Sequence, residues 1–419
     1  MKKILLYISS LMVLSSCSKS FLDVNNSPNS ATFSRSDYAM AGALNTTAQN
    51  LNGPNAIGSA WTGYYGFSTS FTGGGQQKTY VFTNTDFTYW DSYYHNIYDY
   101  QYVIQNGDKE GYSYLVGPAM IMQANLFQSL VDMYGNVPYS QALKLQSYVT
   151  PSYDDAQAIY IDLVKKLDTA ITKIKAATWP SPAPGDIMFS GNKTNWVKLA
   201  NTLKLRILMR QAYVTSQASY ITTELNKIVT EGSGFLTSNA FINPGYVKQT
   251  GKLNPFYSSF GYNENDVEQT NHRFYKMGDV ILNFLKNTHD IFRLQRVADV
   301  KVSNPIPDPV TGLPDKNNPD NYVGIPLGAR GNAYLETLVS SIGSCQVNKG
   351  DATRPIVFMS AAESYFLQAE AAYRSGILAL GDPQLLYQNG ITQSFILDAA
   401  THTGTATATA AAATTAATT

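Results

Sequence analysis

The residues of this chain best suited to chemistry are aromatic side chains in a stretch rich in Gly, Ser and Thr. Flat rings stack on the apolar faces of sugar rings, while nearby hydroxyl and amide groups bond sugar hydroxyls. The aromatic side chains of this stretch could serve either as ligand contacts or as packing in the core, and the sequence leaves both roles open. A later run with helical spacing, around Trp90, Tyr94 and Tyr98, favours core packing. The candidate ligand-binding residues are Trp61, Tyr64, Tyr65, Phe67, Phe71 and, in a later loop, Tyr257.

Catalytic motifs are missing from the sequence. No histidine has H-E-x-x-H spacing, and no G-x-S-x-G, phosphate-binding or dinucleotide-binding motif occurs. The Asp308–Asp320 segment lacks the ligand spacing of a calcium loop, although its Asp and Asn residues leave a calcium site open. We therefore expect no catalytic residue, no cofactor and no metal. A glycosidase needs only two carboxylates, which sequence spacing does not exclude.

Cys17 is the residue most open to covalent modification. Lys2 and Lys3 precede an apolar run, and Leu-Ser-Ser stands directly before the cysteine. A basic start, a short apolar segment and small residues are typical of a secretory signal peptide. The tetrad ending in Cys17 resembles a bacterial lipobox, so we predict that this cysteine becomes the lipid-modified, palmitate-bearing first residue. An ordinary signal peptide is the alternative.

Composition narrows the function classes further. The 419 residues carry 30 basic and 30 acidic side chains, so no basic field is available to attract nucleic acid. With Cys17 lipidated, Cys345 is the remaining thiol, and we interpret it as a packed side chain. No later segment is long and apolar enough to span a membrane. Tyrosine is the most frequent aromatic residue, with 29 copies.

Helical periodicity dominates the chain after Ser36. Ala119–Met133 carries an apolar stripe and ends before Gly135, and a helix reaching about Lys175 is predicted to open with a Ser152 capping box. A third helix is expected from Thr194 to about Val214. A fourth is expected from Ser360 to Gly376, with Phe366, Ala369 and Tyr373 facing inward. Less regular helices are predicted over Asp86–Asn106, Ala218–Thr230, Met277–Lys286 and Pro383–Phe395, and long loops or short strands over 176–193, 233–275 and 300–358.

Two strings of the sequence resemble the SusD/RagB-type outer-membrane lipoproteins of Bacteroidetes, in their starch-binding branch. Residues 130–139 read LVDMYGNVPY, and residues 196–206 read WVKLANTLKLR. The lipobox, the segment from Phe21 to Asn29 and the helix from Glu363 to Ala372 add to the resemblance, which covers about residues 1–395. It implies a mainly α fold of tetratricopeptide-like helix pairs with a loop-rich lobe.

The resemblance also implies a function. Such proteins lie in the outer membrane, exposed at the cell surface and held by a lipid anchor. They capture oligosaccharide, or sometimes peptide, for a TonB-dependent, SusC-like transporter. Their ligand residues are not fixed, so none is carried over to this chain. Two alternatives stay open, a secreted lipoprotein glycoside hydrolase and a helical-repeat scaffold without a small ligand.

The expected organisation follows from these patterns. We predict a signal peptide over 1–16, a lipidated tether over 17–36, a binding domain over 37–397 and a disordered Ala/Thr-rich tail over 398–419. Members of the family continue further beyond the helix around Tyr387. We therefore expect the domain to be incomplete at its C-terminus, through a frameshift or truncation near Phe395.

Overall fold

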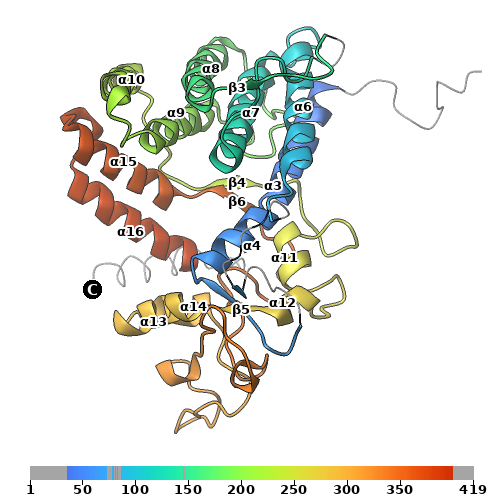
Figure 1. Cartoon of the computed structure of the whole chain (residues 1–419). Coiled ribbons are helices and arrows are strands. Elements are labelled where there is room, and N and C mark those ends of the chain that lie inside the picture. Colours follow the sequence, from blue (N-terminus) through green and yellow to red (C-terminus); the bar gives the residue numbers. More distant parts are fainter. Residues whose placement is uncertain are drawn as a thin grey trace, which may run out of the picture.

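Two hydrophobic cores divide the chain into a helical lobe and a loop-rich lobe (Figure 1). The computed structural model describes residues 35–72, 78–79, 81, 83, 86–144 and 147–399, without the side chain of Leu378. Cys17 and the tail from residue 400 lie outside the described residues. The predicted mainly α fold with a loop-rich lobe is confirmed for the described part.

The helical lobe is a row of helices in which each packs on the next along the chain. α6 lies on α7, α7 on α8 and α8 on α9, while α3 packs on α6 and α15 on α9 (Figure 1). Helices built this way bury one another's apolar stripes without needing long-range strand pairing. The elements are α3 (Ser36–Asn50), α6 (Trp90–Asn106), α7 (Ser113–Tyr134), α8 (Ala156–Ala176), α9 (Lys193–Arg210), α10 (Ala218–Glu231), α15 (Ala361–Ser375) and α16 (Pro383–Ala399).

The connection between α7 and α8 begins and ends with specific caps. Gly135 follows α7 with φ 73°, a conformation that favours glycine. Two short strands, β2 (Val137–Pro138) and β3 (Tyr153–Asp154), then pair antiparallel. Because β3 occupies the predicted capping box, Ser152 does not cap α8. The cap is Asp155, whose side chain accepts a hydrogen bond from the Ala158 amide at 2.9 Å.

The last two helices correct a prediction about which side chains face inward. Ser360 caps α15 through the Glu363 amide at 3.0 Å, and Gly376 ends it with φ 66°, as the sequence predicts. Tyr373 nevertheless lies outward, with 81% of its surface exposed, and Phe366 turns toward α16, where its ring centre lies 5.5 Å from that of Tyr387. α15 instead buries a face of small residues, which lets neighbouring elements approach closely. The inward residues on this helix are Ala361, Ala362, Ser364, Gln368, Ala369, Ala371 and Ala372.

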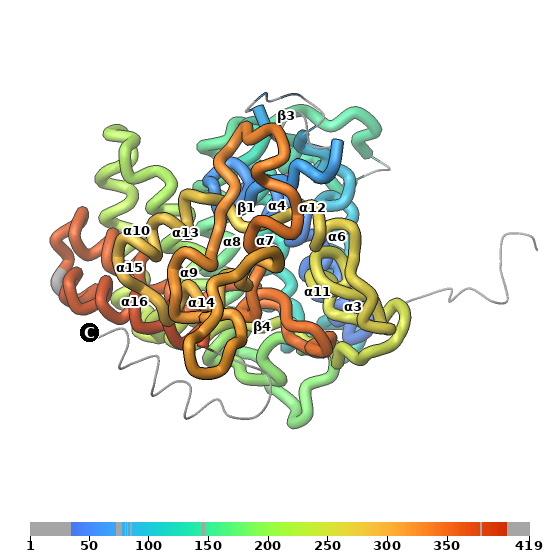
Figure 2. Tube along the Cα trace, turned by 90° about the horizontal axis from the view of Figure 1, so that it is seen from below, coloured from blue at the N-terminus to red at the C-terminus, as the bar shows by residue number. Residues whose placement is uncertain are grey.

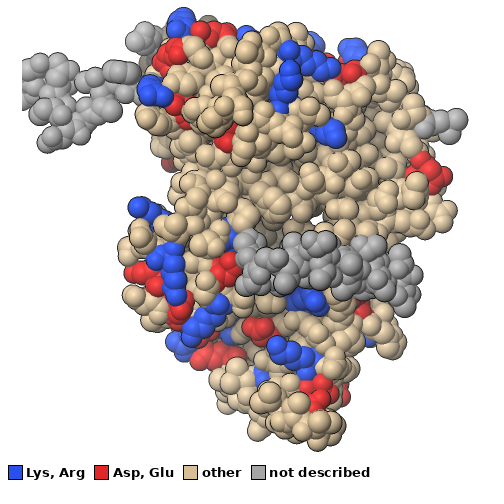
Figure 3. Space-filling model, turned by 180° about the vertical axis from the view of Figure 1, so that it is seen from behind, with Lys and Arg blue, Asp and Glu red and all other residues tan. Residues whose placement is uncertain are grey.

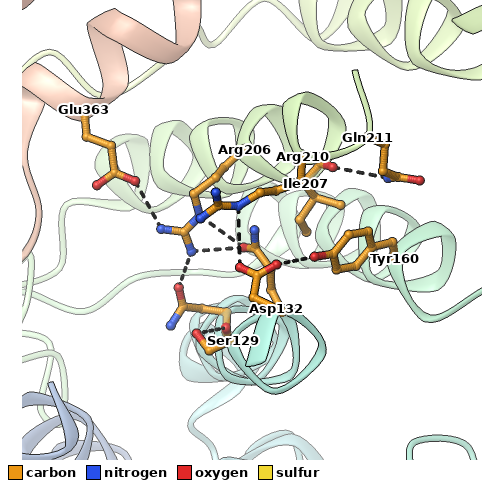
Figure 4. A network of polar contacts seen from close by, with 10 residues as sticks. Ser129, Asp132, Tyr160, Arg206, Ile207, Arg210, Gln211 and Glu363 are labelled. Atoms are coloured by element: carbon orange, nitrogen blue, oxygen red, sulfur yellow. Dashed lines mark hydrogen bonds and ion pairs between the residues drawn. The ribbon is translucent and has the colours of Figure 1, made fainter. Parts of the chain in front are cut away.

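A polar network ties three helices of this lobe together (Figure 4). The Arg206 guanidinium on α9 donates to Gln128 at 3.1 Å and to Asn125 at 2.6 Å, both on α7, and pairs with Glu363 on α15 at 3.2 Å. Arg210, one turn further, lies 3.5 Å from Asp132. The string at 196–206 therefore acts here as a packing motif that joins α7, α9 and α15.

The loop-rich lobe has short elements and long connections. Its core lies around a two-stranded antiparallel sheet in which Tyr65 pairs with Met277 and Phe67 with Tyr275. Seen from below, the segment around residues 300–350 runs across the face of the lobe as extended chain and turns (Figure 2). The elements are α4 (Asn52–Trp61), β1 (Tyr65–Phe67), α11 (Pro255–Phe260), α12 (Thr270–Phe274), β5 (Tyr275–Met277), α13 (Asp279–Asn287) and α14 (Ile291–Val297), with short 3-10 turns at Pro319–Asn321 and Asn332–Tyr334.

The two lobes meet at a narrower waist, visible from behind (Figure 3). β4 (Ala240–Ile242) and β6 (Ile356–Met359) pair antiparallel between the lobes in the view of Figure 1. The predicted loop segment 233–275 thus contains β4, α11 and α12. On the face in Figure 3, basic and acidic side chains are interspersed over the lower lobe rather than separated by sign.

Candidate functional site

Three of the predicted aromatic ligand contacts lie in the core of the loop-rich lobe. Tyr65 and Phe67 belong to β1, and Tyr257 belongs to α11; each has no more than 3% of its surface exposed. The Tyr257 hydroxyl donates to Asp266 at 3.2 Å and accepts from the Gly350 amide at 3.2 Å. This corrects the sequence-based interpretation, because a ring covered on both faces cannot stack on a ligand. These three side chains pack the core instead.

The other three predicted residues lie nearer the surface of the same lobe. Trp61 ends α4 and is partly buried, with its ring centre 5.8 Å from that of Phe87. Phe71 packs edge-on against Phe274 at 5.8 Å, under the Arg273 guanidinium. Tyr64 alone among the six has about half of its surface exposed. For stacking on a ligand, Tyr64 is therefore the strongest of the original candidates.

A well-formed cleft lies in the helical lobe, where the sequence did not predict a site. It has a volume of about 510 Å³ and lies between α6, α7, α8 and the chain that follows β2. Pockets of this size with an apolar floor and a few convergent polar groups are the usual form of ligand sites. Its polar and aromatic lining consists of Gln101, Gln105, Gln123, Phe127, Tyr139, Ser140, Lys144, Asp154, Asp162 and Lys166.

Three consecutive helices each supply this lining through residues four positions apart. α6 supplies Gln101 and Gln105, α7 supplies Gln123 and Phe127, and α8 supplies Ala158, Asp162 and Lys166. Residues at i and i+4 share one helix face, so each helix turns a short polar or aromatic strip to the cleft. These spacings are visible in the sequence, but they do not reveal that the three strips face one another.

The polar groups of the floor are already hydrogen-bonded to one another. Lys166 Nζ donates to Gln123 Oε1 at 2.6 Å, and Gln123 Nε2 donates to Gln101 Oε1 at 2.9 Å. Gln123 is 1% exposed, so its amide is fixed. The Tyr139 hydroxyl donates to Asp162 at 2.6 Å. Such a network holds its donors and acceptors in place before a ligand arrives.

The mouth of the cleft is shaped by the segment that the sequence resemblance identifies. Asp154, on β3, accepts hydrogen bonds from the Tyr139 and Ser140 amides at 2.9 Å and from the Ser140 hydroxyl at 2.7 Å. Beside it, Tyr153 is 64% exposed and stacks on Trp90 with ring centres 6.0 Å apart. The β2–β3 pair thus presents an open aromatic face next to the polar floor.

Burial and these hydrogen bonds shift the pKa values of charged groups in the cleft. Desolvation lowers the pKa of Lys166 to about 8, against the opposing effect of Asp162. Burial alone would raise the pKa of the Asp154 carboxyl. The hydrogen bonds from Ser140 and Tyr139 outweigh this effect, so the pKa is lowered. Asp154 is therefore ionised at neutral pH and is an acceptor rather than a proton donor.

The free thiol of the described residues, Cys345, is not activated as a nucleophile. Burial raises the pKa of the Cys345 thiol, which keeps it protonated. No group of three or more His, Cys, Asp or Glu side chains among the described residues could hold a metal ion. Within the same residues, no helix has the length and apolarity required to cross a membrane.

A second, more open hollow lies between α15 and α16. It has a volume of about 860 Å³ and includes the rings of Phe366, Tyr373 and Tyr387. Its polar lining is limited to Glu370, Asp382 and Gln384, in addition to the tyrosine hydroxyls. Among the described residues, no hydrogen bond joins its polar side chains to one another, unlike those of the cleft beside α8.

The solved structures that match this chain share its fold. A SusD homologue from Bacteroides fragilis is 22% identical, with a TM-score of 0.67 over 87% of this chain and 73% of the homologue. An outer membrane protein of Bacteroides vulgatus whose name refers to nutrient binding is 22% identical, with a TM-score of 0.70 over 92% and 78% of the two chains. A chitin-binding protein is 24% identical, with a TM-score of 0.64 over 90% and 79%. The predicted tetratricopeptide-like helix pairs are thus confirmed at the level of the fold.

Sequence comparison gives the family. No curated protein matches the chain at a significant level. A family model described as starch-binding and associating with the outer membrane matches residues 24–417, which is nearly the whole chain. The chain therefore belongs to the SusD-like family of nutrient-binding proteins.

Proposed function

We propose that this protein is a surface-exposed outer-membrane lipoprotein that captures oligosaccharide, or another nutrient such as a peptide, and delivers it to a TonB-dependent, SusC-like transporter. The observation that carries the proposal is the cleft between α6, α7 and α8, with its fixed amides and adjoining aromatic face. Tyr64, with Trp61 and Phe71, is proposed as an additional contact for a longer ligand.

The geometry of the cleft favours binding over hydrolysis. A glycosidase needs one carboxyl that is protonated at working pH, and burial usually raises its pKa for that purpose. Asp154 has the opposite property, because three hydrogen bonds lower its pKa. The amides and the Tyr139 ring can instead hold hydroxyl groups and a sugar face without chemical change.

The membrane anchor and the transporter rest on the family and on the N-terminal sequence. A lipid on Cys17 would hold the protein at the membrane, since two or three acyl chains anchor a protein stably. The likeness to an outer membrane protein of Bacteroides vulgatus supports the same location. Palmitate labelling tests the anchor: the wild-type protein should incorporate palmitate in cells, and Cys17→Ala should not.

Blocking the cleft tests the binding proposal. Ala158 lies exposed on its wall, so Ala158→Trp should fill part of the space without disturbing the core. Calorimetry against a panel of oligosaccharides and peptides should show a ligand for the wild-type protein and at least tenfold weaker binding for this variant. Gln157→Trp, on the exposed face of the same turn and outside the cleft lining, is the matched control and should bind normally.

The alternatives predict different results in the same experiment. Product analysis that finds ligand cleavage by the purified protein would support a glycoside hydrolase. No binding to any member of the panel would favour a helical scaffold. Equal affinity of wild type and Ala158→Trp would move the site away from the cleft.

A further inference from the structure

The cleft contains a lysine whose ammonium is hydrogen-bonded to a neutral amide rather than to a carboxylate. Lys166 Nζ bonds Gln123 Oε1, a neutral acceptor, and lies 5.7 and 5.4 Å from the ring centres of Phe127 and Tyr139. Among the described residues, no carboxylate lies within ion-pair distance of it, although the charge of Asp162, one turn earlier on α8, favours its protonated form. An ammonium has three N–H donors, and the structure uses one of them. Two donors thus remain for a ligand.

The acidic groups around this ammonium have other partners. Asp162, on the same helix, accepts from the Tyr139 hydroxyl, and Asp154, on β3, accepts three hydrogen bonds from Tyr139 and Ser140. Lys144, beyond them, donates to the Ser140 carbonyl at 2.7 Å. α6 and α7 contribute amides and an aromatic ring to the lining but no charge. These bonds come from neutral groups, so both aspartates keep their charge, and what distinguishes Lys166 is its unused donors, which an anion from outside can accept.

We infer that the cleft binds an acidic saccharide, one whose sugar ring carries a carboxylate that pairs with Lys166. This inference rests on the proposed nutrient-binding function and names its substrate class. The remaining lining fits the rest of such a sugar, because Gln101, Gln105 and Ser140 can bond hydroxyl groups and Tyr139 offers part of a ring face. A peptide would place its C-terminal carboxylate on the same lysine, so peptides form a separate arm of the test.

The pH dependence of binding follows from the state of Lys166. With a pKa of about 8 in the free protein, this amine is mostly charged at pH 7 and mostly neutral at pH 9. A bound carboxylate favours the charged form, so binding takes up a proton above pH 8. Affinity for an acidic ligand should therefore fall about tenfold between pH 7 and pH 9.

The experiment compares acidic sugars with their neutral counterparts. Trimers of galacturonic, glucuronic and mannuronic acid are titrated calorimetrically into the full chain, each beside its own methyl ester, which keeps the sugar backbone and removes the charge. At least one acid should bind about tenfold or more tightly than its ester, in line with a charge-assisted hydrogen bond. Lys166→Met should remove this preference. Lys166→Arg should keep it and should lose the decline between pH 7 and pH 9.

The possible failures are distinguishable. If esters or neutral oligosaccharides bind as tightly as the acids, and Ala158→Trp still abolishes that binding, the acidic-saccharide inference falls and the proposed function stands. If a peptide with a free C-terminus binds through Lys166 and no saccharide does, the substrate class is overturned. If nothing in any arm binds, both proposals fail. A melting temperature of Lys166→Met close to that of the wild type keeps loss of binding separate from loss of folding.

Discussion

The helical lobe and the loop-rich lobe are stabilised in different ways. In the helical lobe, apolar side chains from successive helices form one continuous core, so each contact is one of many. The loop-rich lobe has a smaller core, to which Tyr322, Ile342 and Val347 of its long segment contribute, and part of that segment is held in addition by a buried polar side chain. This side chain is that of Asn321, which is fully buried and bonds the backbone of Ile306 and Asp315.

The comparison has a physical lesson. Burial of apolar area is non-directional and is spread over many residues, so a helical row tolerates small rearrangements and unfolds as a unit. A loop held by directional hydrogen bonds loses its conformation locally when one of these bonds is removed, because the backbone groups that it paired have no other partner. A substitution in the helical lobe should therefore destabilise the whole lobe, whereas one in the loop-rich lobe should disturb only its surroundings. The two effects should also differ in size.

The largest expected effect is in the helical lobe. Trp196 is fully buried and donates to Asp186 at 3.0 Å, so Trp196→Ala should lower the free energy of unfolding by about 3–5 kcal/mol. Urea denaturation should show the loss as a shift of the whole transition of this lobe. Tyr98→Ala, on an exposed face of α6, is the control and should change stability little. A loss confined to the backbone around Asp186 would contradict the cooperative picture.

A smaller and more local effect is expected in the loop-rich lobe. Asn321→Ala removes the acceptor of the Ile306 amide at 2.6 Å and two donors to carbonyls at 2.8 Å, so stability should fall by about 2 kcal/mol. Hydrogen exchange should accelerate around residues 301–322 and remain unchanged in α7 and α8. Asn317→Ala, which loses an exposed contact with Gln295, serves as control. Faster exchange throughout the molecule would show that the loop segment is not an independent unit.

The smallest expected effect concerns the surface aromatic residue of the loop-rich lobe. Tyr64 is about half exposed, so Tyr64→Ala should change the free energy of unfolding by less than about 0.5 kcal/mol. If this ring is a ligand contact, affinity for a long oligosaccharide should fall by about 1–3 kcal/mol, by analogy with stacking of bases on aromatic side chains. The affinity for a trimer that fills only the cleft should not change. Unchanged affinity for every ligand length would restrict binding to the helical lobe.

The accuracy of the sequence-based predictions follows the same division. The helices of the helical lobe are local structures with strong periodicity, and Ser360 and Gly376 mark one of them correctly at both ends. The errors occur where a distant segment intervenes. Ser152 does not cap α8 because β3 pairs with β2 there, and Tyr373 faces outward because α15 buries its alanine-rich side.

The candidate site was less accessible to prediction. The aromatic residues around Tyr65 and Phe67 have the composition of a binding loop, yet β1 pairs with β5 and covers them. Composition does not distinguish a ring that faces solvent from one that faces a core. The residues of the cleft carried no motif, because each helix contributes only a pair or triplet at i, i+4 spacing that also occurs on ordinary solvated faces.

The sequence by itself determined the family, the helical character and the positions of most helices, because these depend on local strings and on periodicity within one segment. Only the tertiary structure decided which side chains form the cleft that we propose as the binding site. Gln101, Gln123 and Lys166 are far apart in the chain and converge because α6, α7 and α8 pack in one row. That packing also leaves the ammonium of Lys166 in a cleft beside a neutral amide, and this burial lowers its pKa.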